Sequence, residues 1–204
     1  MPILFAAISP HPPLILPTVG SKEDKEQVKK TITSLEALGK KVEKLNLDTI
    51  IISSPHPDWG FQVPLFYLAP NFQGKIETFL TGSQEPAYYF EQGQKVYAKY
   101  SQNNNRLGLI ASGDLSHYLK DDGAYGFKDD GPKFDQELIK ALKEKDIEKI
   151  LTLSKTYPEA GECGLRSICF VLGILQSAKI NWQADILSYQ GPFGVGYLVA
   201  DLKI

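Results

Sequence analysis

The sequence has few of the residues, and none of the long apolar runs, that define several large classes of protein. It contains 204 residues but only two cysteines, Cys163 and Cys169, whose spacing matches no common zinc or redox motif. If both lie on one helix they point to opposed faces, which argues against a disulfide between them. No stretch approaches the roughly 20 apolar residues of a membrane span, and the N-terminal residues lack the basic segment of a signal peptide.

Neither sign of charge is in excess. Lys and Arg together number 22 and Asp and Glu 24, which gives a net charge of −2. Such a balance provides no electrostatic footprint for a nucleic acid or an anionic membrane, so we expect neither as a partner. Apolar residues make up 43% of the chain, enough for a sizeable core in one domain over residues 1–204. A cytoplasmic protein is the default expectation.

Short apolar runs alternate with longer helical patterns along the chain. Runs rich in β-branched residues predict strands at 3–8, 49–52, 75–80, 107–111, 184–189 and 195–202. Apolar spacings of three and four predict helices within 28–45, 85–100, 133–143, 146–153 and 161–177. The Asp- and Gly-rich region 120–132 is either a solvated loop or a lid over a site. The alternation predicts a three-layer α/β/α fold with a central mixed, mostly parallel sheet.

The only three histidines each follow a predicted strand. His11 comes after the first strand, His56 after the second, and His117 after the strand at 107–111. His11 and His56 share the frame Ser-Pro-His-Pro, in which the prolines restrict the backbone and suit a rigidly aimed side chain. Because ligands of open α/β sheets bind beyond the carboxyl ends of the strands, we expect the three imidazoles to meet at one edge of the sheet.

A carboxylate beside two of these histidines would complete a metal site. Two histidines and one carboxylate leave open positions on the metal, an arrangement typical of non-haem Fe(II) oxygenases. Glu162 is one candidate, since the start of a helix favours an ionised acid. Asp58 and Asp114 are rivals because they are close in sequence to His56 and His117, although Asp114 better fits a residue that orients a histidine. The residues alone do not rank the three.

Five motifs, in order along the chain, resemble one known family. They are Ser-Pro-His-Pro-Pro-Leu-Ile at 9–15, Ile-Ile-Ser-Ser-Pro-His-Pro-Asp at 51–58, Ala-Ser-Gly-Asp-Leu-Ser-His at 111–117, Gly-Glu-Cys-Gly-Leu-Arg-Ser at 161–167 and Gly-Pro-Phe-Gly-Val-Gly-Tyr-Leu-Val-Ala at 191–200. The sequence resembles the B-type class III extradiol ring-cleavage dioxygenases from residue 2 to residue 202. Within them it is most similar to the dioxygenase-like domain of the AmmeMemoRadiSam system, which is related to Memo proteins.

The resemblance implies a reaction and a set of site residues. Similar enzymes bind Fe(II), chelate a catechol through its two hydroxyls, and use O₂ to cleave the ring outside the diol. By this resemblance His11, His56 and Glu162 are the metal ligands, and His117 is the acid/base that handles a substrate proton. The expected partners are then a small aromatic substrate and O₂. A separate AmmeMemoRadiSam-system protein and a second copy in a homodimer are further expected partners.

Two other interpretations stay open. Two histidines and a glutamate with a bound water also describe catalytic zinc sites, so a Zn-dependent hydrolase or lyase is one alternative, and zinc should compete with iron for the site. The other is a Memo-like, non-enzymatic binding module with a vestigial site. Five aromatic residues flank the motifs and either line a pocket for a flat ring or belong to the core: Trp59, Phe61, Tyr118, Tyr125 and Phe193.

Overall fold

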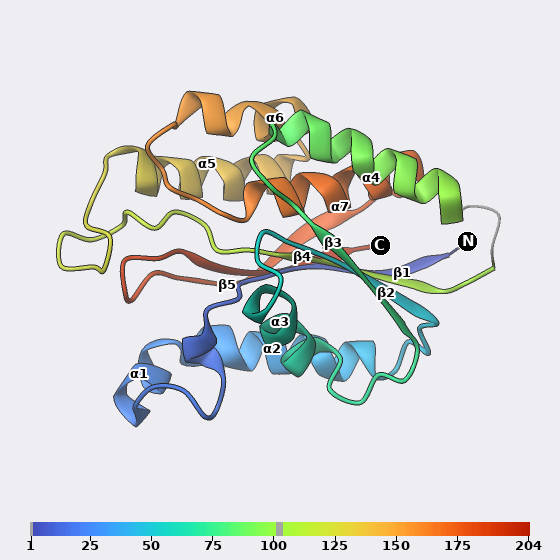
Figure 1. Ribbon diagram of the computed structural model, residues 1–204, viewed down its shortest axis with the longest axis horizontal. Helices are drawn as coiled ribbons and strands as arrows, with labels where there is room; N and C mark the ends of the chain where they lie inside the picture. Colours follow the sequence, from blue (N-terminus) through green and yellow to red (C-terminus); the bar gives the residue numbers. More distant parts are fainter. Residues whose placement is uncertain (1, 101–103) are drawn as a thin grey trace.

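A six-stranded sheet lies at the centre of the molecule (Figure 1). The computed structural model describes residues 2–100 and 104–204. The strands are β1 (Ile3–Ser9), β2 (Thr49–Ser54), β3 (Lys75–Leu80), β4 (Leu107–Ser112), β5 (Gln183–Gln190) and β6 (Tyr197–Lys203), in the order β3-β2-β4-β1-β6-β5. The first four pair in parallel with one another, whereas β6 pairs antiparallel with both β1 and β5. The sheet is therefore mixed and mostly parallel, as the sequence predicts.

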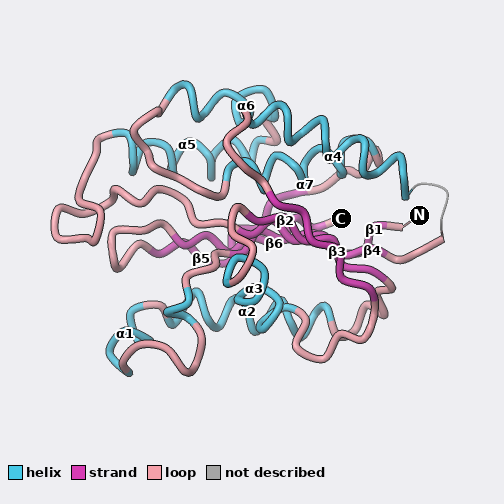
Figure 2. The backbone as a smooth tube through the Cα atoms, in the orientation of Figure 1, coloured by secondary structure: helices cyan, strands magenta, loops and turns pink. Residues whose placement is uncertain are grey.

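Helices cover both faces of the sheet (Figure 2). One face carries α1 (Lys22–Gln27), α2 (Lys29–Val42) and α3 (Trp59–Leu68), preceded by a single 3₁₀ turn, η1 (Pro13–Ile15). The other face carries α4 (Pro86–Tyr100), α5 (Asp130–Glu144), α6 (Ile147–Thr156) and α7 (Leu165–Ser177). The predicted three-layer α/β/α architecture is confirmed. Among the described residues, no helix is long and apolar enough to cross a membrane.

Two helices and several boundaries differ from the pattern predicted by the sequence; α5, for example, begins at Asp130, inside the predicted loop 120–132. The sequence predicts no helix at α3, which contains Pro64, a residue that usually ends a helix; α3 is also apolar on several faces, so it lacks a helical period. Nor does it predict α1, a short polar helix with no buried residue. In addition, α7 begins at Leu165 rather than Gly161, because residues 161–164 form the turn that brings the chain to the sheet edge.

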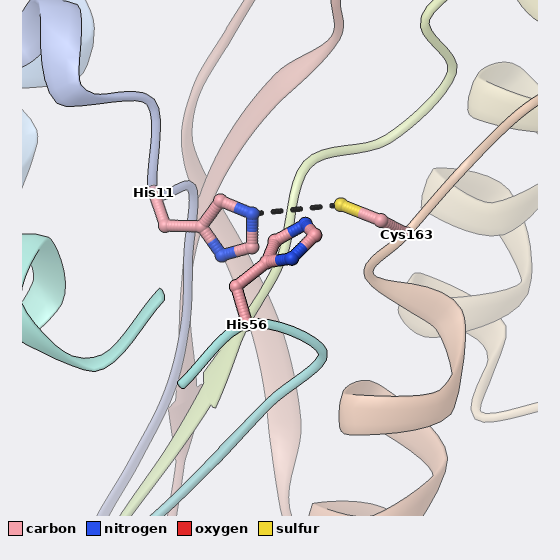
Figure 3. Close-up of side chains that lie close together, drawn as sticks. All are labelled: His11, His56 and Cys163. Atoms are coloured by element: carbon pink, nitrogen blue, oxygen red, sulfur yellow. Dashed lines mark hydrogen bonds between the residues drawn. The ribbon is translucent and has the colours of Figure 1, made fainter. Parts of the chain in front are cut away.

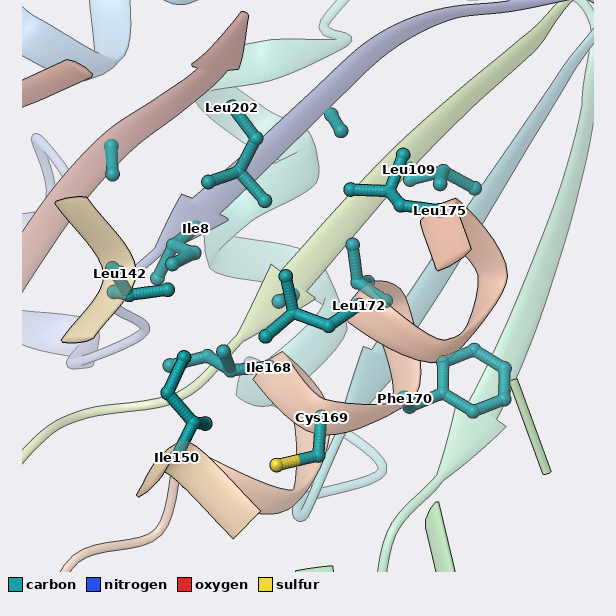
Figure 4. Packing of buried hydrophobic residues seen from close by; sticks show 14 of the residues in the cluster. Ile8, Leu109, Leu142, Ile150, Ile168, Cys169, Phe170, Leu172, Leu175 and Leu202 are labelled. Atoms are coloured by element: carbon teal, nitrogen blue, oxygen red, sulfur yellow. The ribbon is translucent and has the colours of Figure 1, made fainter. Parts of the chain in front are cut away.

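Each face of the sheet has its own hydrophobic core. The larger one lies between the sheet and α4–α7 and includes the predicted inward positions of α7, such as Ile168, Leu172 and Leu175 (Figure 4). The smaller one lies between the sheet and α2 and α3. Full burial of these apolar side chains stabilises the fold by roughly 1.5–3 kcal/mol each. The sheet is thus covered on both faces, and its carboxyl edge is the side where loops meet.

Candidate metal and ligand site

The carboxyl ends of β1, β2 and β4 lie at one level. Ser9 of β1 pairs with Ser112 of β4, and Ser53 of β2 pairs with Ala111 of β4, so each of the three strands ends in a serine beside its neighbours. His11 follows β1 by two residues and His56 follows β2 by two residues. The repeated Ser-Pro-His-Pro frame therefore gives two imidazoles equivalent positions on nearby strands.

His11, His56 and Cys163 form the one group of possible metal-binding side chains among the described residues (Figure 3). One donor atom from each lies within 4.8 Å of the other two. The two imidazole rings stand edge to face with their centroids 5.2 Å apart, and Nε2 of His11 lies 3.5 Å from Sγ of Cys163. Three chain segments that are distant in sequence thus supply two nitrogens and one sulfur to one point.

The hydrogen bonds of Ser112 determine which nitrogen of His11 is free. The Ser112 hydroxyl has one proton and donates it to the carbonyl of Gly60. The same oxygen lies 2.9 Å from Nδ1 of His11 and must accept there, so Nδ1 carries the proton. Nε2 is then an unprotonated acceptor that faces Cys163, which is the state in which imidazole binds a metal.

Burial keeps His11 uncharged. Its pKa is lowered to about 3, mainly by burial and further by the neighbouring His56 and His117. An imidazole with this pKa is neutral throughout the physiological range, and only the neutral ring has a lone pair to offer a metal. Burial and the His56 charge also lower the pKa of His117.

Asp114 joins the end of β4 to His11 and Cys163. Its carboxylate accepts a hydrogen bond from the backbone N–H of His11 at 3.0 Å, and its own N–H donates to Sγ of Cys163 at 3.3 Å. The Asp114 carbonyl accepts from the N–H groups of Cys163 and Gly164. This close approach requires glycine at 113, where a Cβ would lie 2.2 Å from Cα of Gly164. Asp114 thus orients the site, the role that the sequence favours for it.

Cys163 is the member of the group that the sequence motifs did not single out as a ligand. Its spacing from Cys169 matches no metal-binding motif, and both cysteines are free. The available signal was its place in Gly-Glu-Cys-Gly, beside the predicted ligand Glu162 and shortly before α7. Burial, followed by the Asp114 charge, raises the pKa of the Cys163 thiol well above its usual value. The thiol is therefore protonated in the metal-free protein.

Glu162 lies beside this group but does not belong to it. One carboxylate oxygen accepts from the N–H of Leu165 at 2.6 Å, and the other pairs with Nη1 of Arg166 at 3.0 Å. Its side chain is only 6% exposed, and burial raises its pKa despite these hydrogen bonds. In this conformation Glu162 caps the start of α7, so its role as a metal ligand stays a prediction. Asp58 is exposed and directly precedes α3.

A cavity of about 520 Å³ opens beside the histidines. His117 lines it together with His11 and His56, so the three imidazoles meet at one edge of the sheet. Nε2 of His117 is buried and has no hydrogen-bond partner in the described part of the chain, which leaves it available to a ligand. Of the five flanking aromatic residues, Trp59, Tyr125 and Phe193 line the cavity, whereas Phe61 is buried in the smaller core.

The donors fit a transition metal. Neutral imidazole and thiolate are ligands for zinc, copper and iron, and His11 is held in the required tautomer by Ser112. The thiol would lose its proton on binding, as metal-bound cysteines do. The Nε2 atom of His117, which has no partner among the described residues, is available to form a hydrogen bond with a ligand in the cavity.

Residues 54–200 match the family model of the catalytic LigB subunit of aromatic ring-opening dioxygenases. This chain belongs to that family. The matched segment contains His56, Asp114, His117, Glu162 and Cys163, and the structure places His11 beside them from the end of β1.

Two proteins illustrate what the chain is similar to. Protein CA_C1420 of Clostridium acetobutylicum is 29% identical over an alignment that covers 95% of this chain and 56% of the relative. The chain thus spans about half the length of that relative. A crystal structure of the uncharacterized protein JW3007 from Escherichia coli superposes with a TM-score of 0.63 at 16% identity, covering 98% of this chain and 99% of the other. At that identity the likeness concerns the fold of this LigB-family chain.

Proposed function

We propose that this LigB-family protein is a non-haem Fe(II)-dependent extradiol dioxygenase that opens the ring of a catechol-type aromatic diol. The observation that carries the proposal is the convergence of two imidazoles and a third donor on one point, beside a cavity that His117 also lines. A bound ferrous ion would supply the Lewis acidity that lowers the pKa of a diol and the electrons that activate O₂.

The residues of the chain have separate tasks in this proposal. His11 and His56 hold the ion, with His11 oriented through Ser112. His117 accepts a diol proton at Nε2, the buried atom without a partner, and returns a proton later in the cycle. Trp59, Phe193 and the other apolar groups of the lining keep water away from a bound ring.

The third ligand is either Cys163 or Glu162. In the present side-chain conformations the sulfur of Cys163 lies close to both imidazoles, so we propose Cys163 as the third metal ligand of the resting site. Glu162, the ligand implied by the family resemblance, would first have to leave Arg166 and the N–H of Leu165. The identity of the third ligand affects which metal binds, because thiolate is a softer ligand than carboxylate and raises the affinity of the site for zinc and copper.

Metal content of single variants tests the ligands. His11→Ala and His56→Ala should abolish iron retention, and Cys163→Ala should weaken it strongly, whereas Glu162→Gln should retain the metal. Cys169→Ala is the matched control, because Cys169 is a buried thiol in the core away from the cluster. Iron loss in Glu162→Gln with full retention in Cys163→Ala would instead assign the third position to Glu162.

Single-turnover ring opening under oxygen tests the reaction. His117→Ala should keep its iron but open a catechol about 10²–10⁴-fold more slowly, the usual contribution of a general acid or base. Equal iron loss in His117→Ala and His11→Ala would make His117 a ligand instead. Activity of the metal-free protein should return with Fe(II) under reducing conditions, whereas zinc should bind and inhibit. Turnover with zinc alone would favour a hydrolase or lyase.

The thiol supports a second candidate, a Memo-like metal-binding module without ring cleavage. Fe(II) oxygenases of this type use a carboxylate as the third ligand, and the group seen here contains Cys163. In that case the protein should bind a metal through His11, His56 and Cys163 but consume no O₂ with any catechol. Oxygen-electrode measurements on the iron-loaded protein separate the two candidates.

We also assign the chain to the AmmeMemoRadiSam branch and propose a separate protein partner. The five motifs support the branch, and the clostridial relative is about twice as long as the matched region. A protein homologous to the remaining part of that relative is therefore the first partner to test. Coelution of the two purified proteins in size-exclusion chromatography is the expected result, and independent elution at micromolar concentration would contradict it.

A further inference from the structure

The cavity beside the histidines has aromatic walls on two separate elements. Trp59 begins α3 and lies 4.9 Å from the His56 ring, and its residue is 40% exposed. Tyr125 belongs to the loop 118–129, lies 5.1 Å from the His117 ring, and is 58% exposed. Both rings line the cavity. Exposed aromatic faces at the mouth of a cavity suit a flat ligand, because stacking adds to the burial of apolar surface.

The lining contains no cation. Among the described residues that line the cavity there is neither a lysine nor an arginine, and the one carboxyl group is that of Asp114. Two lysines are close in sequence to the lining: Lys120 donates from Nζ to the carbonyl of Pro192 at 2.9 Å, and Lys128 pairs with Glu159 at 3.1 Å. Away from the proposed metal position, a ligand carboxylate in this cavity would therefore lose water without gaining an opposite charge from a lysine or arginine, which is costly.

The residues next to the lining are acidic. Asp58 directly precedes Trp59, and Asp121 and Asp122 lie in the loop just before Ala124; all three are exposed. The nearby cations are Lys120, whose ammonium donates to the Pro192 carbonyl, and Lys128, whose charge is paired with Glu159. The local charge therefore repels an anionic substituent and attracts a cationic one, and this effect weakens with salt.

We propose that this cavity selects a planar aromatic ligand without a carboxylate, and that it favours one whose substituent is an amine. The inference rests on the proposed function for the diol, but the preference itself arises from the walls and the rim. A neutral ring is held by Trp59 and Tyr125. An ammonium group on that ring gains the attraction of Asp58, Asp121 and Asp122 and of the aromatic faces.

Three ring-matched probes test this preference: catechols with an ethyl, an aminoethyl and a carboxyethyl substituent. Binding is measured by calorimetry and by quenching of Trp59 fluorescence, with and without iron and in the absence of oxygen. Trp182 is buried in the core, so its signal should stay constant. The ethyl and aminoethyl probes should bind at least about tenfold more tightly than the carboxyethyl probe. Equal or tighter binding of the carboxyethyl probe, or no binding of any probe, would overturn the proposal.

One matched pair of variants and one double variant identify the source of the preference. Ala124→Lys adds a cation at an exposed lining position and should strengthen carboxyethyl binding about tenfold, while Ala124→Gln, of similar length, should not. Asp121→Asn combined with Asp122→Asn should reduce the advantage of the aminoethyl over the ethyl probe. Unchanged affinities in both Ala124→Lys and the double variant would show that charge near the rim does not select the ligand.

Failure of this inference and failure of the proposed function give different results. Selective binding of the aminoethyl and ethyl probes without ring opening of either would leave the inference standing and remove the dioxygenase proposal. Efficient binding and ring opening of the carboxyethyl probe would overturn the inference and leave the dioxygenase proposal standing.

Discussion

At the scale of the residue, Ser112 has a larger role than its size suggests. Its single hydroxyl proton goes to Gly60, which forces His11 to donate from Nδ1 and leaves Nε2 free. Removing a partner of this kind typically costs about 10–100-fold in metal affinity. We therefore expect Ser112→Ala to weaken metal binding by that factor in a competition titration with a chromogenic chelator.

The control is Ser53→Ala, which removes a buried serine near the end of the neighbouring strand β2. The Ser53 hydroxyl donates to the Ser167 carbonyl, whereas the Ser112 hydroxyl accepts from a histidine. Loss of the Ser53 hydroxyl should reduce stability without changing metal affinity. If the two variants bound metal equally, the orientation of His11 would have to come from another group.

At the scale of the element, α7 depends on a close approach to α4. Gly93 of α4 faces the Phe170 carbonyl, and Gly173 of α7 faces the Phe90 carbonyl, where an added Cβ would lie only 2.0 Å from the carbonyl oxygen in each case. Backbone cannot yield as a flexible side chain can, so Gly173→Ala should lower the free energy of unfolding by about 1–3 kcal/mol. Urea denaturation should show a lower midpoint with an unchanged m-value.

Gly82→Ala provides the matched control for this substitution. At that position a Cβ would meet only the Tyr89 hydroxyl oxygen, at 3.3 Å, a much milder contact than a backbone oxygen at 2.0 Å. Because Cys163 lies shortly before α7, Gly173→Ala should also weaken metal binding if the helix shifts. If the urea midpoint of Gly173→Ala equalled that of Gly82→Ala, α4 and α7 could move apart without a loss of stability.

At the scale of the whole molecule, a buried carboxyl group makes stability depend on pH. Asp135 accepts hydrogen bonds from the Tyr189 hydroxyl at 2.6 Å and from the Ser116 N–H at 2.8 Å. Burial outweighs both and raises the pKa of Asp135 from 3.8 to about 7. Between these values the unfolded chain has released the proton while the folded protein keeps it. The contribution of Asp135 to the free energy of unfolding therefore falls as pH rises from about 4 to about 7.

Asp135→Asn should remove this contribution. The variant can still accept from the Ser116 N–H and can donate its amide to the Tyr189 oxygen, so the fold should persist. The slope of unfolding free energy against pH should become less negative by up to about 1.4 kcal/mol per pH unit in that window. The control Asp129→Asn changes an exposed side chain. Identical slopes in the two variants would mean that Asp135 is ionised in the folded protein.

Much of the architecture follows from the sequence alone. All six strands lie where short apolar runs predict them, because the central strands are buried along their length. Five of the helices lie where apolar spacing predicts them, because each buries one face. His11, His56 and His117 could be assigned to one sheet edge for a similar reason, since parallel strands carry their following residues to the same side. The extent of the domain over residues 1–204 and the preference for iron stay predictions.

Only the tertiary structure decided which donor completes the group with the two histidines. Glu162 and Cys163 are adjacent in sequence, and neither composition nor spacing distinguishes their directions. The turn at 161–164 sets these two directions. The Asp114 carbonyl accepts hydrogen bonds from the N–H groups of Cys163 and Gly164, while Arg166 and the N–H of Leu165 bind the Glu162 carboxylate. The contacts of Asp114 join segments almost 50 residues apart in sequence, whereas those of Glu162 are local. Side-chain direction at such a junction depends on long-range packing, which a local pattern does not contain.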